Sequence, residues 1–293
     1  MQLLLYLLVY PLILFISILP FRLLYLLSDA VFFLIFYVAR YRRKVVRDNI
    51  ALALPHLSKK ERIIIEKKSY QHLCDMLLEM VKTLSISKQE MEKRFVFKNL
   101  ETYLAFEEKG KSVALMLAHY ASYEWAIIMN TKINYDGYGI YKKINNLYFD
   151  RLVGKIRSKF STHLIHTSDS SALIEDNTST GKKGVYGFVS DQSPMVKPKT
   201  YWTKFMGVEV PVYTGVEYLS KKHDMAVVYL QVTKVKRGYY EAAFEVLAEN
   251  TIGIPNYGIT DVFLRKVEAQ IIKAPEFYLW THRRWKHKDR NTN

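Results

Sequence analysis

Residues 112–124 read Ser-Val-Ala-Leu-Met-Leu-Ala-His-Tyr-Ala-Ser-Tyr-Glu. The run from Ser112 to Ala118 is almost wholly apolar and has the length of a strand that is buried on both faces of a sheet. His119 follows this run directly, Glu124 comes five positions later, and residues 121–131 have a helical pattern. Open α/β sheets bind ligands at the carboxyl ends of their strands. This junction is therefore a candidate reaction site.

Strand and helix patterns alternate on both sides of this junction. Residues 41–93 have helical spacing, with Ser58 and Glu61 in a capping-box pattern at one helix start. The expected strands are residues 112–118, 138–141, 185–189, 225–232 and 241–247, and the expected later helices are residues 121–131, 147–160 and 261–273. This order predicts a single α/β domain whose central, mostly parallel sheet is flanked by helices.

The pair His119 and Glu124 has a spacing that suits general base catalysis only in one context. On one continuous helix the two side chains would point about 140° apart. They can meet if His119 ends a strand and Glu124 lies in the first turn of the next helix. A carboxylate beside an imidazole fixes its tautomer and raises its basicity. His56 and Glu61 have the same spacing between two helices, where a surface position is expected, and the spacing alone leaves a structural role for His119 open.

The N-terminus is long and apolar enough to be a membrane anchor. No charge occurs in residues 1–21, which would span roughly 31 Å as a helix. A second apolar stretch continues to Ala39, and a basic cluster follows at residues 40–47. The start lacks the basic n-region and the cleavage site of a signal peptide. We therefore expect an anchor over 1–39 and a domain over 40–293 on the cytoplasmic face of the membrane; Pro11 leaves a tilted or partly inserted helix open.

Composition limits the partners and the chemistry. The 293-residue chain has a net charge of +15, which suits nucleic acid, anionic lipid or an acidic protein. Its single cysteine, Cys74, rules out an internal disulfide. The histidines form no convincing metal set, and no glycine-rich phosphate loop occurs. No nucleic-acid-binding signature is present, so we expect neither a metal nor a nucleic-acid partner.

Several motifs together resemble one family over nearly the whole chain. They are Arg42 to Pro55, His119 with Glu124, Tyr141-Lys142-Lys143 with Asn146-Leu147 and Arg157, Asp191-Gln192, Phe205-Met206-Gly207, and Ala274 to Lys286. The last of these, Pro-Glu-Phe-Tyr-Leu-Trp-Thr-His-Arg-Arg-Trp-Lys, is long and unusual in composition. The chain resembles the bacterial lipid A biosynthesis acyltransferases, the HtrB/LpxL-like branch of the lysophospholipid acyltransferase superfamily.

The resemblance implies an inner-membrane enzyme that moves a fatty acyl chain from acyl-acyl carrier protein to a hydroxyl of a lipid A precursor, with no further cofactor. It makes His119 the general base and Glu124 its orienting partner. Four further residues would bind substrate: Lys142, Arg157, Asp191 and Gln192. The positive charge would then serve the acidic carrier protein, the anionic membrane surface and the phosphates of the lipid acceptor.

At several positions this sequence differs from the family pattern, and these differences bear on the identity of the acyl acceptor. Lys142 stands where the family often has arginine, no proline separates Asn146 from Leu147, and Val208 to Val212 replace an Ala-x-Thr segment. An aminolipid or glycolipid acceptor, with an amine as one possible nucleophile, is therefore an alternative. A non-catalytic binding module on the membrane is the other alternative.

Overall fold

The structure is a computed structural model that describes residues 2–290. Ten α-helices are described: α1 (Gln2–Ile18), α2 (Phe21–Phe33), α3 (Arg43–Ala53), α4 (Lys59–Lys82), α5 (Lys88–Arg94), α6 (Glu101–Glu108), α7 (Leu147–Arg157), α8 (Ser170–Ser179), α9 (Gly215–Lys222) and α10 (Gly258–Lys273). A π-helical turn, η1 (Leu34–Val38), extends α2, and two 3₁₀ segments are η2 (Tyr123–Thr131) and η3 (Pro275–Phe277).

A seven-stranded sheet forms the centre of the molecule, in the order β1-β9-β8-β2-β5-β3-β4. All neighbours are parallel except β8 and β9, which form an antiparallel hairpin. Its strands are β1 (Phe95–Phe97), β2 (Val113–Leu117), β3 (Asp136–Tyr141), β4 (His163–His166), β5 (Gly184–Val189), β8 (Ala226–Lys236) and β9 (Tyr239–Ala248). The predicted α/β fold with a mostly parallel sheet is confirmed. A separate hairpin, β6 (Trp202–Phe205) and β7 (Val208–Pro211), was not predicted.

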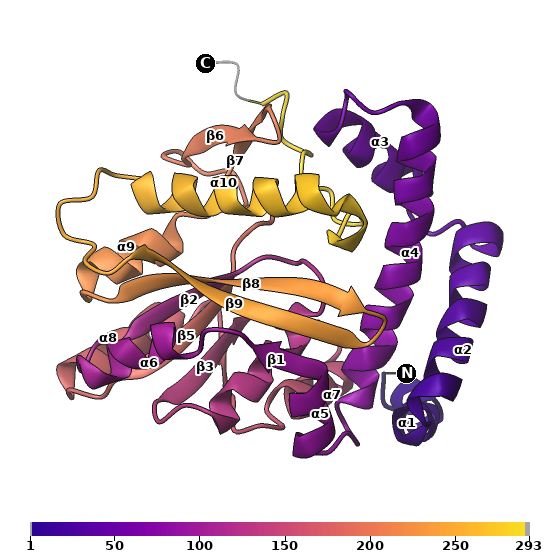
Figure 1. Cartoon of the computed structure of the whole chain (residues 1–293), viewed down its shortest axis with the longest axis horizontal. Coiled ribbons are helices and arrows are strands. Elements are labelled where there is room, and N and C mark those ends of the chain that lie inside the picture. Colours follow the sequence, from indigo (N-terminus) through magenta and orange to yellow (C-terminus); the bar gives the residue numbers. More distant parts are fainter. Residues whose placement is uncertain (1, 291–293) are drawn as a thin grey trace.

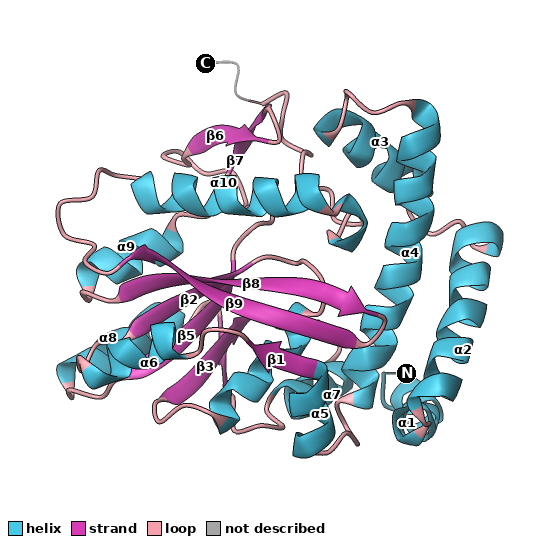
Figure 2. Ribbon diagram, viewed as in Figure 1, coloured by secondary structure: helices cyan, strands magenta, loops and turns pink. Residues whose placement is uncertain are grey.

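Strand β2 occupies the middle of the sheet because its sequence is apolar on both faces. All five of its residues are buried, and it pairs in parallel with β5 on one side and β8 on the other. Helix α10 lies along one face of the sheet, with the small β6–β7 hairpin beyond it (Figure 1). Helices surround the sheet, as the colouring by secondary structure shows (Figure 2).

Helix α4 stands beside the end of the sheet at which β8 turns into β9 (Figure 1). The predicted capping box at its start is present: Ser58 accepts a hydrogen bond from the Glu61 amide, and the Glu61 carboxylate accepts one from the Ser58 amide. Further along α4, the backbone carbonyl of Glu79 accepts a hydrogen bond from the indole N–H of Trp125, at 3.2 Å. Helix α4 therefore contacts η2, the segment that follows β2.

The N-terminal helices pack against α4 on its outer side (Figure 1). Residues 1–21 do not form one helix, because α1 ends at Ile18 and α2 begins at Phe21, directly after Pro20. Within the described residues, Phe21–Val38 is the one helical stretch long and apolar enough to cross a membrane, with mean hydropathy 1.9, and 22% of it is buried. Length and composition alone make it a candidate.

Polar contacts hold α2 on the domain. Ser28 donates a hydrogen bond to Asp75 of α4 at 2.8 Å, and Asp29 forms an ion pair with Arg237 at 2.6 Å. Arg237 lies in the turn between β8 and β9, beside Gly238, which has a φ of +74° and leaves no room for a side chain against the Tyr25 hydroxyl. The apolar helix is therefore docked laterally on the domain, through side chains that a lipid environment would not satisfy.

Candidate active site

Parallel pairing brings His119 and Asp191 together at one edge of the sheet. The register places Leu117 of β2 opposite Val189 of β5, and the amide of Ser190 donates to the carbonyl of Leu117 at 3.1 Å. His119 lies two residues after Leu117, and Asp191 lies two residues after Val189. The carboxyl ends of adjacent parallel strands meet at the same edge, so the two side chains come into contact without any sequence proximity.

The imidazole of His119 donates a hydrogen bond from Nδ1 to Oδ1 of Asp191 at 2.7 Å, and the His119 amide donates to the same oxygen at 3.0 Å. Burial of Asp191, which is 0% exposed, would by itself raise its pKa. The charge and the N–H donors of His119 outweigh that effect and hold the pKa of this carboxyl below its usual value. An ionised Asp191 fixes the Nδ1–H tautomer, so Nε2 is the nitrogen that can accept a proton.

Glu124 has a different partner from the one expected. Its carboxylate accepts two hydrogen bonds from the guanidinium of Arg157 on α7, one of them from Nε at 2.8 Å. Asp191 takes the position beside the imidazole that was expected for Glu124. The physical reason is that η2 begins as a tight 3₁₀ turn after the left-handed residue Ala121, at φ 50°, and Glu124 is fixed there by a bidentate pair with α7.

Tyr123 lies between the His119–Asp191 pair and the Glu124–Arg157 pair. Its ring packs edge-on against the imidazole of His119, with centroids 5.0 Å apart. Burial raises the pKa of its hydroxyl well above the usual value, and the carboxylates of Glu124 and Asp191 add to that effect. Tyr123 therefore stays neutral between these two pairs.

The other two residues predicted to bind substrate lie at the same edge of the sheet. Lys142 follows β3, the neighbour of β5, and is exposed on the loop before α7. Gln192 follows Asp191 and is partly buried. Substrate binding by Lys142, Arg157, Asp191 and Gln192 stays a prediction.

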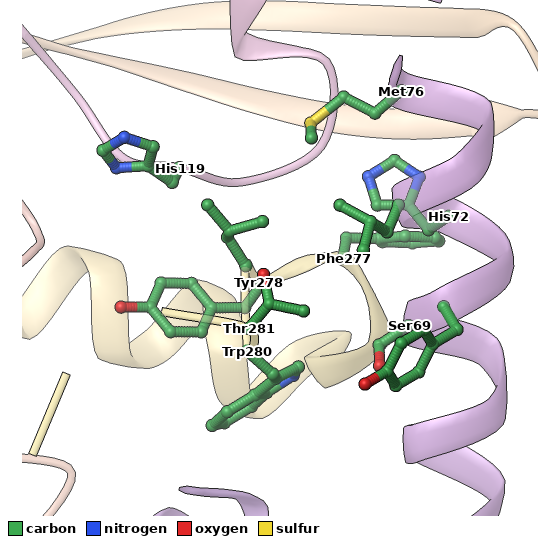
Figure 3. Close-up of a pocket in the computed structure, with 11 residues that line it drawn as sticks. Ser69, His72, Met76, His119, Phe277, Tyr278, Trp280 and Thr281 are labelled. Carbon is green, nitrogen blue, oxygen red and sulfur yellow. The ribbon is translucent and has the colours of Figure 1, made fainter. Parts of the chain in front are cut away.

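The C-terminal segment closes the site from one side. The amide of Leu279 donates a hydrogen bond to the carbonyl of His119 at 3.1 Å. The amide of Ala121 donates one to the carbonyl of Phe277 at 2.9 Å. A pocket lies between this segment and α4 beside His119, and Figure 3 shows Ser69, His72 and Met76 on the helix facing Phe277, Trp280 and Thr281. Burial lowers the pKa of His72 to about 3, which keeps this wall of the pocket uncharged.

Sequence reasoning did not assign the structural partners of the imidazole. Asp191 had a usable signal, because it lies two residues after the strand predicted at 185–189, and His119 likewise comes directly after the strand predicted at 112–118. Tyr278 and His282 are also close to Asp191, and burial lowers the pKa of His282 to about 4 although Asp191 opposes the shift. Their place in the site depends on how the C-terminal segment packs, which local sequence patterns do not predict.

The fold and this geometry define a class of protein: an α/β enzyme with a carboxylate-bound imidazole at the end of a central parallel strand. Residues 2–287 match the family described as bacterial lipid A biosynthesis acyltransferase. The chain is similar to the lipid A biosynthesis palmitoleoyltransferase of Escherichia coli (strain K12), with 23% identity over 249 residues that cover 84% of this chain and 79% of the relative. The lipid A biosynthesis acyltransferase of Shigella flexneri matches with the same identity and coverage.

The chain therefore belongs to the bacterial lipid A biosynthesis acyltransferase family and is an acyltransferase. This confirms the family that the motifs indicated. The family match extends over the N-terminal helices and over the C-terminal segment through His287, so it includes every residue of the site described above.

Proposed function

We propose that this enzyme transfers a fatty acyl chain from acyl-acyl carrier protein to a hydroxyl of a lipid A precursor, at the cytoplasmic face of the inner membrane. The observation that carries the proposal is the His119–Asp191 pair at the carboxyl end of β2 and β5, in a chain of the lipid A acyltransferase family. Both curated relatives carry names from lipid A biosynthesis.

In this mechanism His119 is the general base. The acceptor hydroxyl gives its proton to Nε2 of His119 while its oxygen attacks the thioester carbonyl carbon. Asp191 stabilises the imidazolium that forms. The tetrahedral intermediate then collapses, the carbon–sulfur bond breaks, and His119 returns the proton to the thiolate of the carrier. Backbone N–H groups or a basic side chain would stabilise the oxyanion.

The remaining site residues would bind and orient the substrates. Arg157 uses Nε and Nη2 to hold Glu124, which leaves Nη1 of the guanidinium for a substrate oxygen. Lys142 is an exposed cation at the same edge of the sheet and suits a phosphate or carboxylate of the acceptor or the carrier. In this proposal Glu124 acts through Arg157, as a positioning residue.

The test is mass spectrometry of total lipids, lipid A included, from cells that lack the gene and cells that carry the wild type, His119→Ala or His56→Ala. We expect lipid A to lose one acyl chain in the deletion strain, and only the wild type and His56→Ala to restore it. An unchanged lipid A together with a phospholipid or aminolipid that loses an acyl chain would make the acceptor wrong. Full complementation by His119→Ala would overturn the catalytic role.

Membrane attachment is the second part of the proposal, with the outer faces of α1 and α2 in contact with lipid. Leu24, Ser28, Phe32 and Phe36, which share one side of α2 and η1, are buried against the domain. The opposite side is apolar and exposed, with Leu26 at 66% and Phe33 at 58%. A helix docked through one face presents the other to a bilayer.

This attachment is tested by flotation with vesicles of phosphatidylethanolamine and phosphatidylglycerol. The double variant Leu26→Glu/Phe33→Glu is expected to lose most vesicle binding, because two charges would have to enter the lipid interface. Ile252→Glu is the matched control, since Ile252 is 78% exposed in the loop between β9 and α10, away from α2. Equal binding of the double variant and the wild type would exclude this face as the attachment surface.

A further inference from the structure

A groove next to the pocket at His119 has no role in the proposed mechanism. It has a volume of about 380 Å³, against about 10 Å³ for that pocket, and it lies where α2, α4, η3 and the β8–β9 turn meet. His72 and Phe277 line both spaces, and their rings meet edge-on with centroids 5.0 Å apart. Of the residues that the structure describes, His119 borders the pocket and not the groove. The groove is therefore a second cavity, which shares one wall with the reaction site.

Positive charge is in excess in this groove. Its charged lining consists of four cations and three carboxylates: Lys68, Lys234, Lys236 and Arg237, with Asp29, Asp75 and Glu276. The guanidinium of Arg237 lies 2.6 Å from Asp29 and 2.7 Å from Asp75. The third carboxylate, Glu276, lies 3.7 Å from the ammonium of Lys68. Because each carboxylate is already paired with a cation, the groove favours an anionic ligand.

Lys236 is the cation of the groove that has no carboxylate partner within residues 2–290. Its side chain is exposed, and its ammonium lies 4.4 Å from the ring centroid of Tyr239. This cation–π contact holds the ammonium in place and leaves N–H donors for an anion. Lys236 therefore supplies a positive charge that the protein itself does not neutralise.

Lys234 is a second donor, and it is fixed in place from two sides. Its Nζ lies 3.3 Å from Oδ2 of Asp75 and 3.3 Å from Nδ1 of His72. Burial lowers the pKa of His72 to about 3, and the charge of Lys234 adds to that effect, so the neutral imidazole accepts from the ammonium. An ammonium has three N–H donors, so one remains for a ligand. Lys234 and Lys236, two positions apart on β8, thus offer donors to the same groove.

The groove borders the face of α2 that is proposed to contact lipid. One helical turn takes about 3.6 residues, so Asp29 lies about 60° around α2 from Leu26 and about 40° from Phe33. On the other side of the groove, Val235 is 57% exposed and stands between Lys234 and Lys236. Exposed apolar side chains next to cations are typical of surfaces at the depth of lipid headgroups.

We propose that this groove binds the phosphate of a membrane-lipid headgroup, with Lys234 and Lys236 as its ligands. The site rests on the lipid contact of α2 proposed above and is separate from the acyl-transfer pocket. A phosphate in the groove would meet the two ammonium groups, and the acyl chains of the same lipid would lie along α2 beside Leu26 and Phe33. Arg237, held by two carboxylates, fixes the turn that carries these donors.

The test measures headgroup binding with a soluble lipid and without any acyl donor. Dihexanoyl phosphatidic acid is titrated into the full-length protein in a neutral detergent, and calorimetry gives the dissociation constant. Dihexanoyl phosphatidylcholine, which has the same chains and a zwitterionic headgroup, corrects for partition into the detergent micelles. Inorganic phosphate alone is the third probe, because a free phosphate ion shares the chemistry of the headgroup.

We expect Lys236→Gln to weaken the binding of phosphatidic acid about tenfold, because it removes one charge-assisted contact. Lys236→Arg should keep most of the affinity, since it keeps the charge. Lys183→Gln is the matched control with the same change of charge, because Lys183 is exposed in the loop before β5, at the opposite edge of the sheet. It should bind as the wild type does. Inorganic phosphate should bind more weakly than the lipid, because it makes no contact with the apolar face of α2.

Equal affinity of Lys236→Gln and the wild type for phosphatidic acid overturns the site. An equal loss in Lys183→Gln would reveal a general effect of net charge and overturns it as well. Inorganic phosphate that binds as tightly as the lipid would make a lipid the wrong occupant. Because the probe is soluble and no acyl group moves, the result is independent of the proposed function. Specific binding by a protein that neither floats with vesicles nor changes any lipid would keep the site and make the attachment and the acyl transfer wrong.

Discussion

The chain contains two segments with the same pattern, His56 with Glu61 and His119 with Glu124, and they have unrelated structures. His56 is exposed in the turn between α3 and α4, and Glu61 caps α4 through Ser58. His119 follows a buried strand and is bound to Asp191. Among the described residues, no hydrogen bond joins either histidine to the glutamate of its own segment. The histidine–glutamate spacing alone therefore does not define a site. In the 119–124 segment the site is formed by the end of β2 and by Asp191, which follows the neighbouring strand β5.

The largest expected difference between the two segments is in acyl transfer. His119→Ala should lower kcat/KM by about 10³-fold, because it removes a proton acceptor that contributes about 10²–10⁴-fold. His56→Ala should leave the rate unchanged. The measurement is transfer of a radiolabelled acyl chain from the acyl carrier protein by purified enzyme. Equal rates for the two variants would remove the distinction.

The next largest effect is expected for Asp191→Asn, which should lower kcat/KM by about 10²-fold. An amide does not stabilise the imidazolium or hold the Nδ1–H tautomer. The same variant has a signature in stability. The pKa of Asp191 in the folded protein is held below its usual value, so the charge stabilises the fold above about pH 4, and this contribution is lost as the pH falls.

Urea unfolding measured between pH 3 and pH 7 checks the stability part. The wild type should lose stability toward acid more steeply than Asp191→Asn. Parallel pH profiles of the two proteins would contradict the assigned ionisation of Asp191, even where the kinetic loss is observed.

Glu124→Gln should have a smaller and different effect. It breaks the bidentate pair with Arg157, which is a charge-assisted interaction at the site edge, and we expect a loss of about 2 kcal/mol in unfolding free energy. The rate should fall by about tenfold, mainly through KM, because Arg157 loses its orientation while the His119–Asp191 pair is kept. Glu61→Gln is the control with the same chemical change. A drop in kcat as large as that of His119→Ala would place Glu124 on the proton path.

The smallest effect is expected for the segment that contains His56 and Glu61. Ser58→Ala removes the N-cap of α4 and should cost about 1 kcal/mol of stability. Acyl transfer by the folded protein should not change, because the cap is at the opposite end of α4 from Glu79, the residue that contacts Trp125. Thermal unfolding and the acyl-transfer assay together check this. A loss of activity without a loss of stability would give the 56–61 segment a role in the site.

The sequence predicted the elements whose signals are local. The apolar run at 112–118 and the run at 185–189 became the central strands β2 and β5, and the capping box at Ser58 is present as expected. The helix expected at 121–131 is a 3₁₀ segment from Tyr123 to Thr131, because the backbone turns sharply at Ala121. The hairpin β6–β7 was missed, since four-residue strands with charged side chains carry little periodicity.

The residues of the site divide in the same way, into those predicted from local sequence and those placed by tertiary structure. By itself, the sequence determined the apolar N-terminal helices, the α/β architecture, the family and the position of His119 at a strand end, because hydrophobic periodicity and motifs are written in consecutive residues. Tertiary structure alone decided that Asp191 binds the imidazole, that Glu124 pairs with Arg157, that α2 docks on α4, and that Lys234 and Lys236 line a groove beside α2. Those contacts depend on the register of neighbouring parallel strands and on the packing of a distant chain segment, neither of which is encoded by spacing along the chain.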